Sequence, residues 1–326
     1  MTLEQLHEKL RFLYDDTRKD ISIYATTPTT GLRLFNIENQ FLDELKVAFI
    51  DEINAVINNP SDNFTLENYS SSTKQFDAIY LFDIPDQLNL EMQYLKEVKE
   101  IVALDNFVVD QENSIDQVNG LYIVIKSDEH VISLYKHIFG VDKIYAQRNL
   151  FIVRSHDQFV KQTESMLRIS SSFQMLCVDD EIIMTDIQKL ERIMDLKEVL
   201  TNRAAEHITT IVNERQLVKD SVQLERVSKE PTMAKKLIHA LTQGKVFLLN
   251  ISNAEIIAFA QSKGAKLNMS FEDNQFDLKN KAEARRFIKL IDDDYLTSGL
   301  TQEDYDANQK QELYCGLLTE RHFFFV

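Results

Sequence analysis

The chain has 326 residues, of which 44% are hydrophobic and 10% aromatic, and it contains no tryptophan. Its seven glycines and four prolines are too few for a collagen-like chain or for long flexible linkers. The formal net charge of −16, taken as a whole, argues against a nucleic-acid partner.

The first half of the chain alternates between helical and extended patterns. Apolar residues at helical spacing predict helices over residues 3–18, 41–57, 88–103 and 129–138. Short apolar runs predict strands over residues 21–26, 32–37, 78–82 and 121–125, the first two as a pair. The clearest predicted loop is residues 58–72, NNPSDNFTLENYSSS.

Two hairpins are predicted next, one of residues 144–147 with 150–153 and one of residues 173–178 with 181–184. The second turns at Asp179 and Asp180, which a metal could use but which are ordinary residues for a tight turn.

The second half of the chain is mostly helical in pattern. Helices are predicted over residues 186–217 (two helices meeting near Asp195), 231–241, 253–264 and 280–291. Strands are predicted over residues 246–251, 267–271 and 313–318.

These elements indicate a mixed α/β (α+β) fold in which hairpins and short sheets combine with long helices in two lobes. No strand-then-glycine pattern supports a doubly wound nucleotide-binding sheet. Because the acidic, polar residues 105–120 separate two well-patterned halves, we predict one domain over residues 1–110 and another over residues 111–326.

The expected compartment is the cytoplasm. Residues 1–16 have the pattern of an amphipathic acidic helix and not of a signal peptide, and no apolar run approaches the about 18–20 residues that span a bilayer. Cys177 and Cys315 fit neither a metal-binding spacing nor a disulfide framework, so we interpret them as reduced thiols of a soluble protein.

The charge is unevenly distributed along the chain. Residues 1–120 have a net charge of −13, residues 121–225 of −3, residues 226–290 of +6 and residues 291–326 of −6. Because the Debye length is about 8 Å at physiological salt, a ligand responds to the local patch more than to the total. The positive region is either a phosphate-binding surface or a solvated helical face.

The candidate DNA-binding residues are the cations of this positive region. They are Lys235, Lys236, Lys263, Lys266, Lys279, Lys281, Arg285, Arg286 and Lys289. Asn280 is predicted to cap the helix that carries the last of these, with Glu283 three residues later in a capping-box pattern.

Three consecutive carboxylates end this helix and a polar turn follows. These candidate structural or partner-contact residues are Asp292, Asp293, Asp294, Tyr295, Ser298 and Thr301. Nucleases gather carboxylates around two metals, but adjacent helical residues point about 100° apart, so at most two of the three could reach one ion. Acid at a helix C-terminus also opposes the helix dipole, so we expect a cation, turn amides or another subunit nearby. We predict no catalytic residue, metal or cofactor, and keep a metal-dependent nuclease as an alternative.

Residues 287–301, FIKLIDDDYLTSGLT, followed by Tyr305, resemble the C-terminal signature of the Kiwa anti-phage B component (KwaB) family. In that signature a helix ends in Leu-Leu-Asn-Asp-Asp, and a serine, a Leu-Thr pair and a tyrosine follow. Here Ile-Asp-Asp-Asp replaces Leu-Asn-Asp-Asp. Residues 119–204 are also similar to this family, and the resemblance covers about residues 105–315.

The resemblance implies an intracellular defence effector that binds DNA and works with a small multi-span membrane protein (KwaA-like), which reports phage attack. It supplies no catalytic triad. We expect binding to the DNA backbone without sequence preference, a homo-oligomer, and a position in the cytoplasm or at the inner face of the membrane through the partner. A non-catalytic assembly protein, docking through its acidic N-terminal region or its apolar tail at residues 322–326, is a further alternative.

Overall fold

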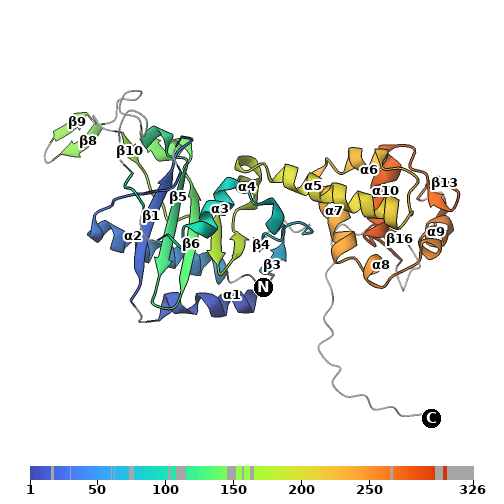
Figure 1. Cartoon of the computed structure of the whole chain (residues 1–326), viewed down its shortest axis with the longest axis horizontal. Coiled ribbons are helices and arrows are strands. Elements are labelled where there is room, and N and C mark those ends of the chain that lie inside the picture. Colours follow the sequence, from blue (N-terminus) through green and yellow to red (C-terminus); the bar gives the residue numbers. More distant parts are fainter. Residues whose placement is uncertain are drawn as a thin grey trace, which may run out of the picture. The chain divides into compact units, whose positions relative to one another are not determined.

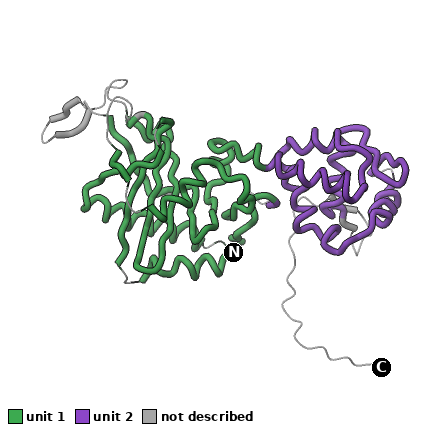
Figure 2. Tube along the Cα trace, viewed as in Figure 1, with its two compact units in different colours: residues 1–70, 75–199 green, residues 71–74, 200–326 purple. Residues whose placement is uncertain are grey.

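The computed structural model describes residues 1–15, 18–29, 31–59, 61, 63–72, 77–101, 104–107, 115–144, 152–155, 158–161, 165–264, 267–297 and 304–306. The chain divides into two compact units (Figure 2). Unit 1 comprises Met1–Ser70 and Gln75–Val199, and unit 2 comprises Ser71–Lys74 and Leu200–Val326. The boundary predicted near residue 110 falls inside unit 1, because strands on both sides of it pair in one sheet.

Unit 1 is built on a mixed sheet that has eight strands within the described ranges (Figure 1). In spatial order the strands are β2 (Arg33–Leu34), β1 (Asp20–Thr26), β5 (Gly120–Lys126), β6 (Val131–His137), β11 (Met175–Val178), β12 (Glu181–Met184), β4 (Ala78–Leu81) and β3 (Thr65–Asn68). Neighbouring strands are antiparallel except β3 and β4, which are parallel. The predicted pair over residues 21–26 and 32–37 is confirmed as β1 and β2, whereas β3 lies in the segment predicted as a loop.

Two N-terminal helices cover one face of the sheet. They are α1 (Leu3–Leu10), continued by the 3₁₀ turn η1 (Arg11–Tyr14), and α2 (Asn39–Ile57). The buried stripe of α2, with Phe49 and Ile53, packs on strand residues such as Ile123 and Leu134. Helical periodicity therefore located both helices, although the first is shorter than predicted.

The opposite face is covered by α3 (Leu90–Glu97), the helix predicted over residues 88–103. The hydroxyl of Ser133 in β6 donates a 2.5 Å hydrogen bond to the carbonyl oxygen of Leu95 in α3. Tyr122 and Tyr135 lie opposite each other on β5 and β6 on this same side, and both are buried.

Residues 131–137 form β6, so the helix predicted over residues 129–138 is wrong. This strand pairs with β5 on one side and β11 on the other. Its alternate residues serve two faces: Leu134 enters the core under α1 and α2, while Ser133 reaches α3. Pairing on both sides satisfies the backbone polar groups and overrides the local helical spacing.

The two predicted hairpins have different outcomes. Residues 173–178 and 181–184 form the antiparallel pair of β11 and β12, as predicted. Most of the hairpin predicted over residues 144–147 and 150–153 lies outside the described residues. Its described ends pair with other segments: β7 (Lys143–Ile144) pairs with β10 (Met166–Leu167), and β8 (Ile152–Ser155) pairs with β9 (Gln158–Lys161).

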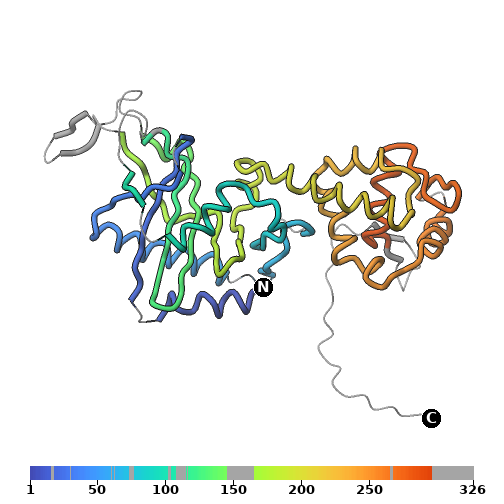
Figure 3. The backbone as a smooth tube through the Cα atoms, viewed as in Figure 1, coloured from blue at the N-terminus to red at the C-terminus, as the bar shows by residue number. Residues whose placement is uncertain are grey.

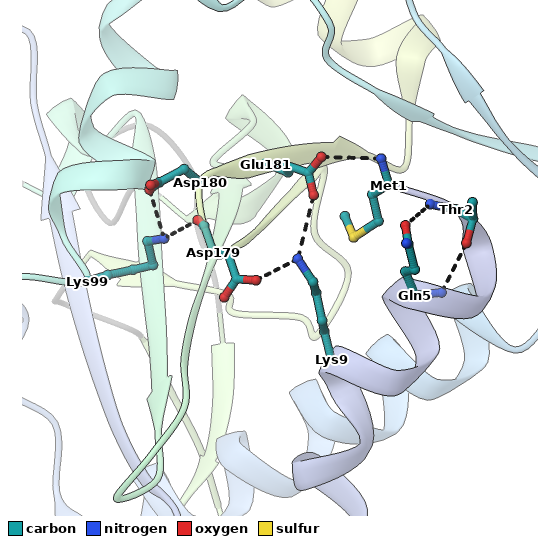
Figure 4. Close-up of polar contacts among 8 residues, drawn as sticks. All are labelled: Met1, Thr2, Gln5, Lys9, Lys99, Asp179, Asp180 and Glu181. Atoms are coloured by element: carbon teal, nitrogen blue, oxygen red, sulfur yellow. Dashed lines mark hydrogen bonds and ion pairs between the residues drawn. The ribbon is translucent and has the colours of Figure 1, made fainter.

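The acidic turn between β11 and β12 is held by cations from two helices (Figure 4). Lys9 of α1 pairs with Asp179 at 2.6 Å and Lys99, just after α3, pairs with Asp180 at 3.6 Å. Asp179 has a positive φ of 49°, which aspartate tolerates in tight turns. These carboxylates therefore join the two helices to the hairpin, in agreement with their interpretation as turn residues.

Unit 2 is mainly helical, and a long helical segment leads into it. This segment contains α4 (Ile187–Ile193), α5 (Leu196–Thr209) and the π-helical turn η5 (Thr210–Glu214), and Asp195 breaks it with a positive φ of 48° near the predicted junction. The helices that follow are α6 (Val222–Val227), α7 (Pro231–Thr242), α8 (Lys245–Leu248), α9 (Asn253–Ser262) and α10 (Lys281–Ile291). Helix α10 packs beside α6 and α7, which precede it by several elements in the chain (Figure 3).

Two of the three strands predicted in unit 2 differ from the structure. Residues 245–248 form α8 and not the predicted strand. The strand predicted over residues 267–271 is reduced to β13 (Phe271–Glu272), which pairs with β14 (Gln275–Phe276). The strand predicted over residues 313–318 lies outside the described residues. The short antiparallel pair β15 (Tyr295–Thr297) and β16 (Asp304–Asp306) follows α10.

Together the two units confirm the predicted α+β class.

Candidate functional site

The candidate site is built around α10, which begins at Asn280 as predicted. The Asn280 Oδ1 accepts hydrogen bonds from the N–H groups of Ala282 (2.9 Å) and Glu283 (3.0 Å). The buried Glu283 carboxylate accepts one from Asn280 Nδ2 (2.8 Å) and one from the N–H of Ser270 (3.3 Å). These contacts satisfy the free donors at the helix start and fix the position of the first turn.

A stripe of cations follows one side of α10. Lys281, Arg285 and Lys289 lie four residues apart and so share a side of the helix, and we call them the α10 stripe. Lys281 and Arg285 are exposed and Lys289 is half-buried. Phe287, on the other side of the helix, is completely buried, which holds the stripe outward.

The two arginines of α10 have different partners. Arg285 donates from Nε (3.1 Å) and Nη2 (2.6 Å) to the Glu230 carboxylate, and this pairing lowers the pKa of Glu230. Arg286 donates from Nη2 to the carbonyl oxygen of Asn268 at 2.9 Å, which ties α10 to the preceding segment. Lys281 forms no ion pair with any residue in the described part of the chain.

The remaining predicted cations lie on other elements of unit 2. Lys279 is exposed and forms an ion pair with Asp277, which raises the pKa of Lys279. Lys263 lies with its Nζ 5.1 Å from the ring centre of Phe259. Lys235 on α7 is half-buried. Lys266 lies outside the described residues.

Lys236 is buried and does not belong to the exposed cationic surface on which the sequence placed it. Its Nζ lies 2.7 Å from Asp294 Oδ2 and 3.3 Å from Asp292 Oδ2, and all three side chains are at most 6% exposed. Burial alone would lower the pKa of Lys236, but the hydrogen bonds and charges of Asp294 and Asp292 outweigh it, so the pKa is raised. A buried lysine needs such partners because an isolated ammonium is costly to desolvate.

His239 joins the same cluster one turn further along α7. Its Nδ1 is 2.5 Å from Asp292 Oδ1, and its side chain is 30% exposed. His239 was not among the residues predicted from the sequence. Its three-residue spacing from Lys236 predicts a shared helix face and is the signal that could have identified it.

The aspartate run closes α10. Asp292 is the residue that follows the helix, and Asp293 is exposed with a positive φ of 58°. Asp294 is 1% exposed and points into unit 2 toward Lys236. Lys236 thus supplies positive charge where two carboxylates oppose the helix dipole. Tyr295, the first residue of β15, is half-buried, and Ser298 and Thr301 lie outside the described residues.

The described residues contain no group of three or more His, Cys, Asp or Glu side chains arranged to hold a metal ion. At the aspartate run the ammonium of Lys236 already contacts Asp292 and Asp294. None of the helices within the described ranges is both long and apolar enough to cross a bilayer.

A protein-family profile described as Kiwa protein KwaB-like matches residues 115–301, more than half of the chain. The chain belongs to this KwaB-like family. The match extends from η3 (Ile115–Gln117) through α10, so it includes parts of both units and confirms the resemblance carried by residues 287–301.

The similarity also extends beyond the family profile. The chain is 26% identical over 326 residues to Kiwa protein KwaB of Escherichia coli O55:H7 (strain RM12579 / EPEC). The aligned region covers 96% of this chain and 99% of that protein. No solved structure matches the chain. The aspartate run lies within the matched residues, and in this chain Asp292 and Asp294 form part of the Lys236–Asp292–Asp294–His239 cluster.

Proposed function

We propose that this chain is the KwaB component of a Kiwa anti-phage defence system and that it acts as a DNA-binding effector. Membership of the KwaB-like family supports the role in defence. The α10 stripe supports the DNA-binding role, because Lys281, Arg285 and Lys289 bring three cations onto one side of one helix.

The proposed interface consists of the α10 stripe with Lys279 beside the helix start. Lys236 is excluded because its charge is used by Asp292 and Asp294, and Arg286 acts mainly in holding Asn268. Contacts of lysine and arginine with phosphates release counterions and give affinity without reading the base sequence. We therefore expect the protein to bind unrelated DNA sequences with similar affinity.

The test is a charge-reversal variant, Lys281→Glu/Arg285→Glu, in fluorescence anisotropy with a labelled duplex. Affinity should fall at least about tenfold, because two phosphate contacts become repulsive. Arg11→Glu/Arg18→Glu changes the net charge equally at exposed positions of unit 1 and is the matched control. An equal loss in both variants, or in neither, would contradict the assignment of the interface.

A metal-dependent nuclease using Asp292, Asp293 and Asp294 is the alternative function. It requires Lys236 to give up two carboxylates, since a divalent cation and this ammonium compete for the same oxygens. Incubating the protein with plasmid DNA and Mg²⁺ or Mn²⁺ separates the two functions. Cleavage that disappears in Asp294→Asn, with binding retained, would replace the proposal with a nuclease.

The proposed partners are a small multi-span membrane protein (KwaA-like) and further copies of this chain. Such a membrane partner would hold the protein at the inner face of the membrane. Co-purification with the product of a neighbouring gene, from membranes dissolved in mild detergent, tests the first partner. Light scattering coupled to size exclusion tests the second, and a monomer at all concentrations would exclude the homo-oligomer.

A further inference from the structure

Lys136 is a buried lysine of unit 1 with no carboxylate ion pair among the described residues. It lies near the end of β6 on the same face as Ile132 and Leu134, and its residue exposure is 2%. The nearby Asp142 carboxylate pairs instead with Arg168, at 2.9 Å. Lys136 differs in this from Lys236, which has two aspartates.

Two serines take the place of the missing carboxylate. Lys136 Nζ lies 2.8 Å from Ser170 Oγ, 3.1 Å from the carbonyl oxygen of Ser172 and 3.3 Å from Ser172 Oγ. The two hydroxyl oxygens are 3.1 Å apart. Ser170 and Ser172 are exposed while Lys136 is buried, so a ligand can reach the hydroxyls and the amine is shielded from water.

Lys136 Nζ is the donor in all three contacts, and a neutral amine can also satisfy them. A neutral lysine has two N–H donors and one lone pair, whereas an ammonium has three donors and no acceptor. The carbonyl of Ser172 must accept from Nζ, and Ser172 Oγ can accept the second N–H. When Lys136 is neutral, its lone pair faces Ser170 Oγ, 2.8 Å away, and the hydroxyl becomes the donor of this hydrogen bond.

The electrostatic surroundings favour this neutral form. Burial is the largest cause, and it lowers the pKa of Lys136. Asp142 and Glu52 act in the opposite direction, and Lys189 and Arg168 lower the pKa further, so the net direction is down. A lysine with a lowered pKa loses its proton more readily and can then serve as a general base.

We propose that Ser170 and Lys136 form a serine–lysine dyad that transfers acyl groups from carboxylic esters, with Ser170 as the nucleophile and Lys136 as its general base. Ser172 is a positioning residue that directs the lone pair of Lys136 toward Ser170. The same division between an activated hydroxyl and a lysine base occurs among serine hydrolases.

The reaction balances with water as the co-substrate. Ser170 Oγ bonds to the ester carbonyl carbon as its proton passes to Lys136 Nζ. The carbon–oxygen bond of the ester breaks, and the departing alkoxide takes that proton and leaves as an alcohol. Water then attacks the acyl-serine and gives a proton to Lys136, which returns it to Ser170 Oγ as the carboxylic acid is released.

A fluorophosphonate probe tests the nucleophile on the intact protein. Ser170 Oγ should attack phosphorus with loss of fluoride, and peptide mass spectrometry should locate one adduct on Ser170. Ser170→Ala should abolish the adduct, whereas Ser171→Ala, at the neighbouring position, should leave it unchanged. Absence of an adduct on Ser170 in folded protein would overturn the proposal.

The base is tested by Lys136→Met and Lys136→Arg, checked for folding by circular dichroism. Methionine fills the buried space, and arginine keeps N–H donors at this position but cannot act as a base at neutral pH. Both variants should label at least about a hundredfold more slowly, as expected when a general base is lost. In the wild type the labelling rate should rise with pH to a plateau reached below 10.5, the ordinary pKa of lysine. Labelling at the wild-type rate in folded Lys136→Arg would show that Ser170 reacts without this base.

Hydrolysis of p-nitrophenyl acetate provides a second readout. The wild type should release nitrophenolate faster than Ser170→Ala, and Ser172→Ala should have an intermediate rate with a shifted pH profile. Equal rates for the wild type and Ser170→Ala would contradict ester hydrolysis at this site.

Discussion

At the scale of single residues, Lys236 determines how the aspartate run is used. Replacing it by methionine keeps the volume of the side chain but leaves Asp292 and Asp294 buried without their cation. Removing one partner of a buried pair typically costs about 3–5 kcal/mol, so we expect Lys236→Met to lose about that much free energy of unfolding in urea titrations. The exposed Lys281→Met should change it by less than about 0.5 kcal/mol.

The pH dependence of this difference follows from the raised pKa of Lys236. A lysine whose pKa is higher in the folded state contributes its full stability below its unfolded pKa, and loses it as the pH rises through the folded pKa. The gap between wild type and Lys236→Met should therefore be constant from neutral pH to about 10 and shrink above 10.5. A gap that shrinks toward neutral pH would mean that Lys236 is not stabilised in its charged form.

Glu230 is expected to limit the DNA affinity of the α10 stripe. Its carboxylate accepts two hydrogen bonds from Arg285 and so competes with phosphate for this guanidinium. Glu230→Gln should raise affinity for DNA several-fold and make the plot of log affinity against log salt steeper by about 0.9, as for one added phosphate contact. Glu225→Gln, an exposed position on α6, is the charge-matched control, and an equal gain there would assign the effect to net charge alone.

The sequence shows that this region is rich in cations, but it does not show which of them are exposed and which are buried. Lys235, Lys236 and Lys281 have the same chemistry and similar local surroundings in the sequence, so residue type cannot separate them. Their burial is set by how α7 packs against α10, a contact between segments about 50 residues apart. The need for a compensating cation at the aspartate run could be argued from the helix dipole, whereas the identity of that cation required the packing.

At the scale of elements, Asn280 is expected to stabilise α10 through its cap. Asn280→Ala removes the acceptor for the N–H groups of Ala282 and Glu283, and should cost about 1 kcal/mol of unfolding free energy in urea titrations. Asn280→Ser retains an acceptor oxygen and should cost less. If the two variants were equally destabilised, the loss would come from the Asn280 contact with Glu283 and not from capping.

The long periodic helices and most of the short apolar strands in the sheet of unit 1 were predicted well, whereas the segments that became β6 and α8 were not. The stripe of α2, the proline at the start of α7 and the cap of α10 are local signals, and each helix formed where its signal lies. The segments that became β6 and α8 are short apolar runs, which periodicity alone cannot assign. Strand pairing with β5 and β11 decided the first. The segment that became α8 forms one short helix between α7 and α9, and nothing in its sequence distinguishes this helix from a strand.

At the scale of the whole molecule, local sequence patterns also failed to locate the boundary between the two compact units. A polar stretch near residue 110 looks like a linker, yet β1 before it and β5 after it pair over their full lengths. The boundary between the compact units instead falls within the helical stretch of α5, where the sequence has no break in composition. Long-range strand pairing, which the sequence does not display, therefore decides which residues form a unit.

The salt dependence of DNA binding tests whether the positive region of the chain or its negative net charge governs the affinity. The chain carries −16 overall, whereas residues 226–290 carry +6. If about four cations contact phosphates, the plot of log affinity against log salt should have a slope near −3.6, and affinity should fall roughly a hundredfold between 50 and 200 mM salt. Two duplexes of equal length and unrelated sequence, measured by anisotropy, should give the same slope and similar affinities, since phosphate contacts carry no base information. A slope near zero would mean that the cations of the α10 stripe do not contact phosphates. A strong preference for one duplex would require base contacts beyond the α10 stripe.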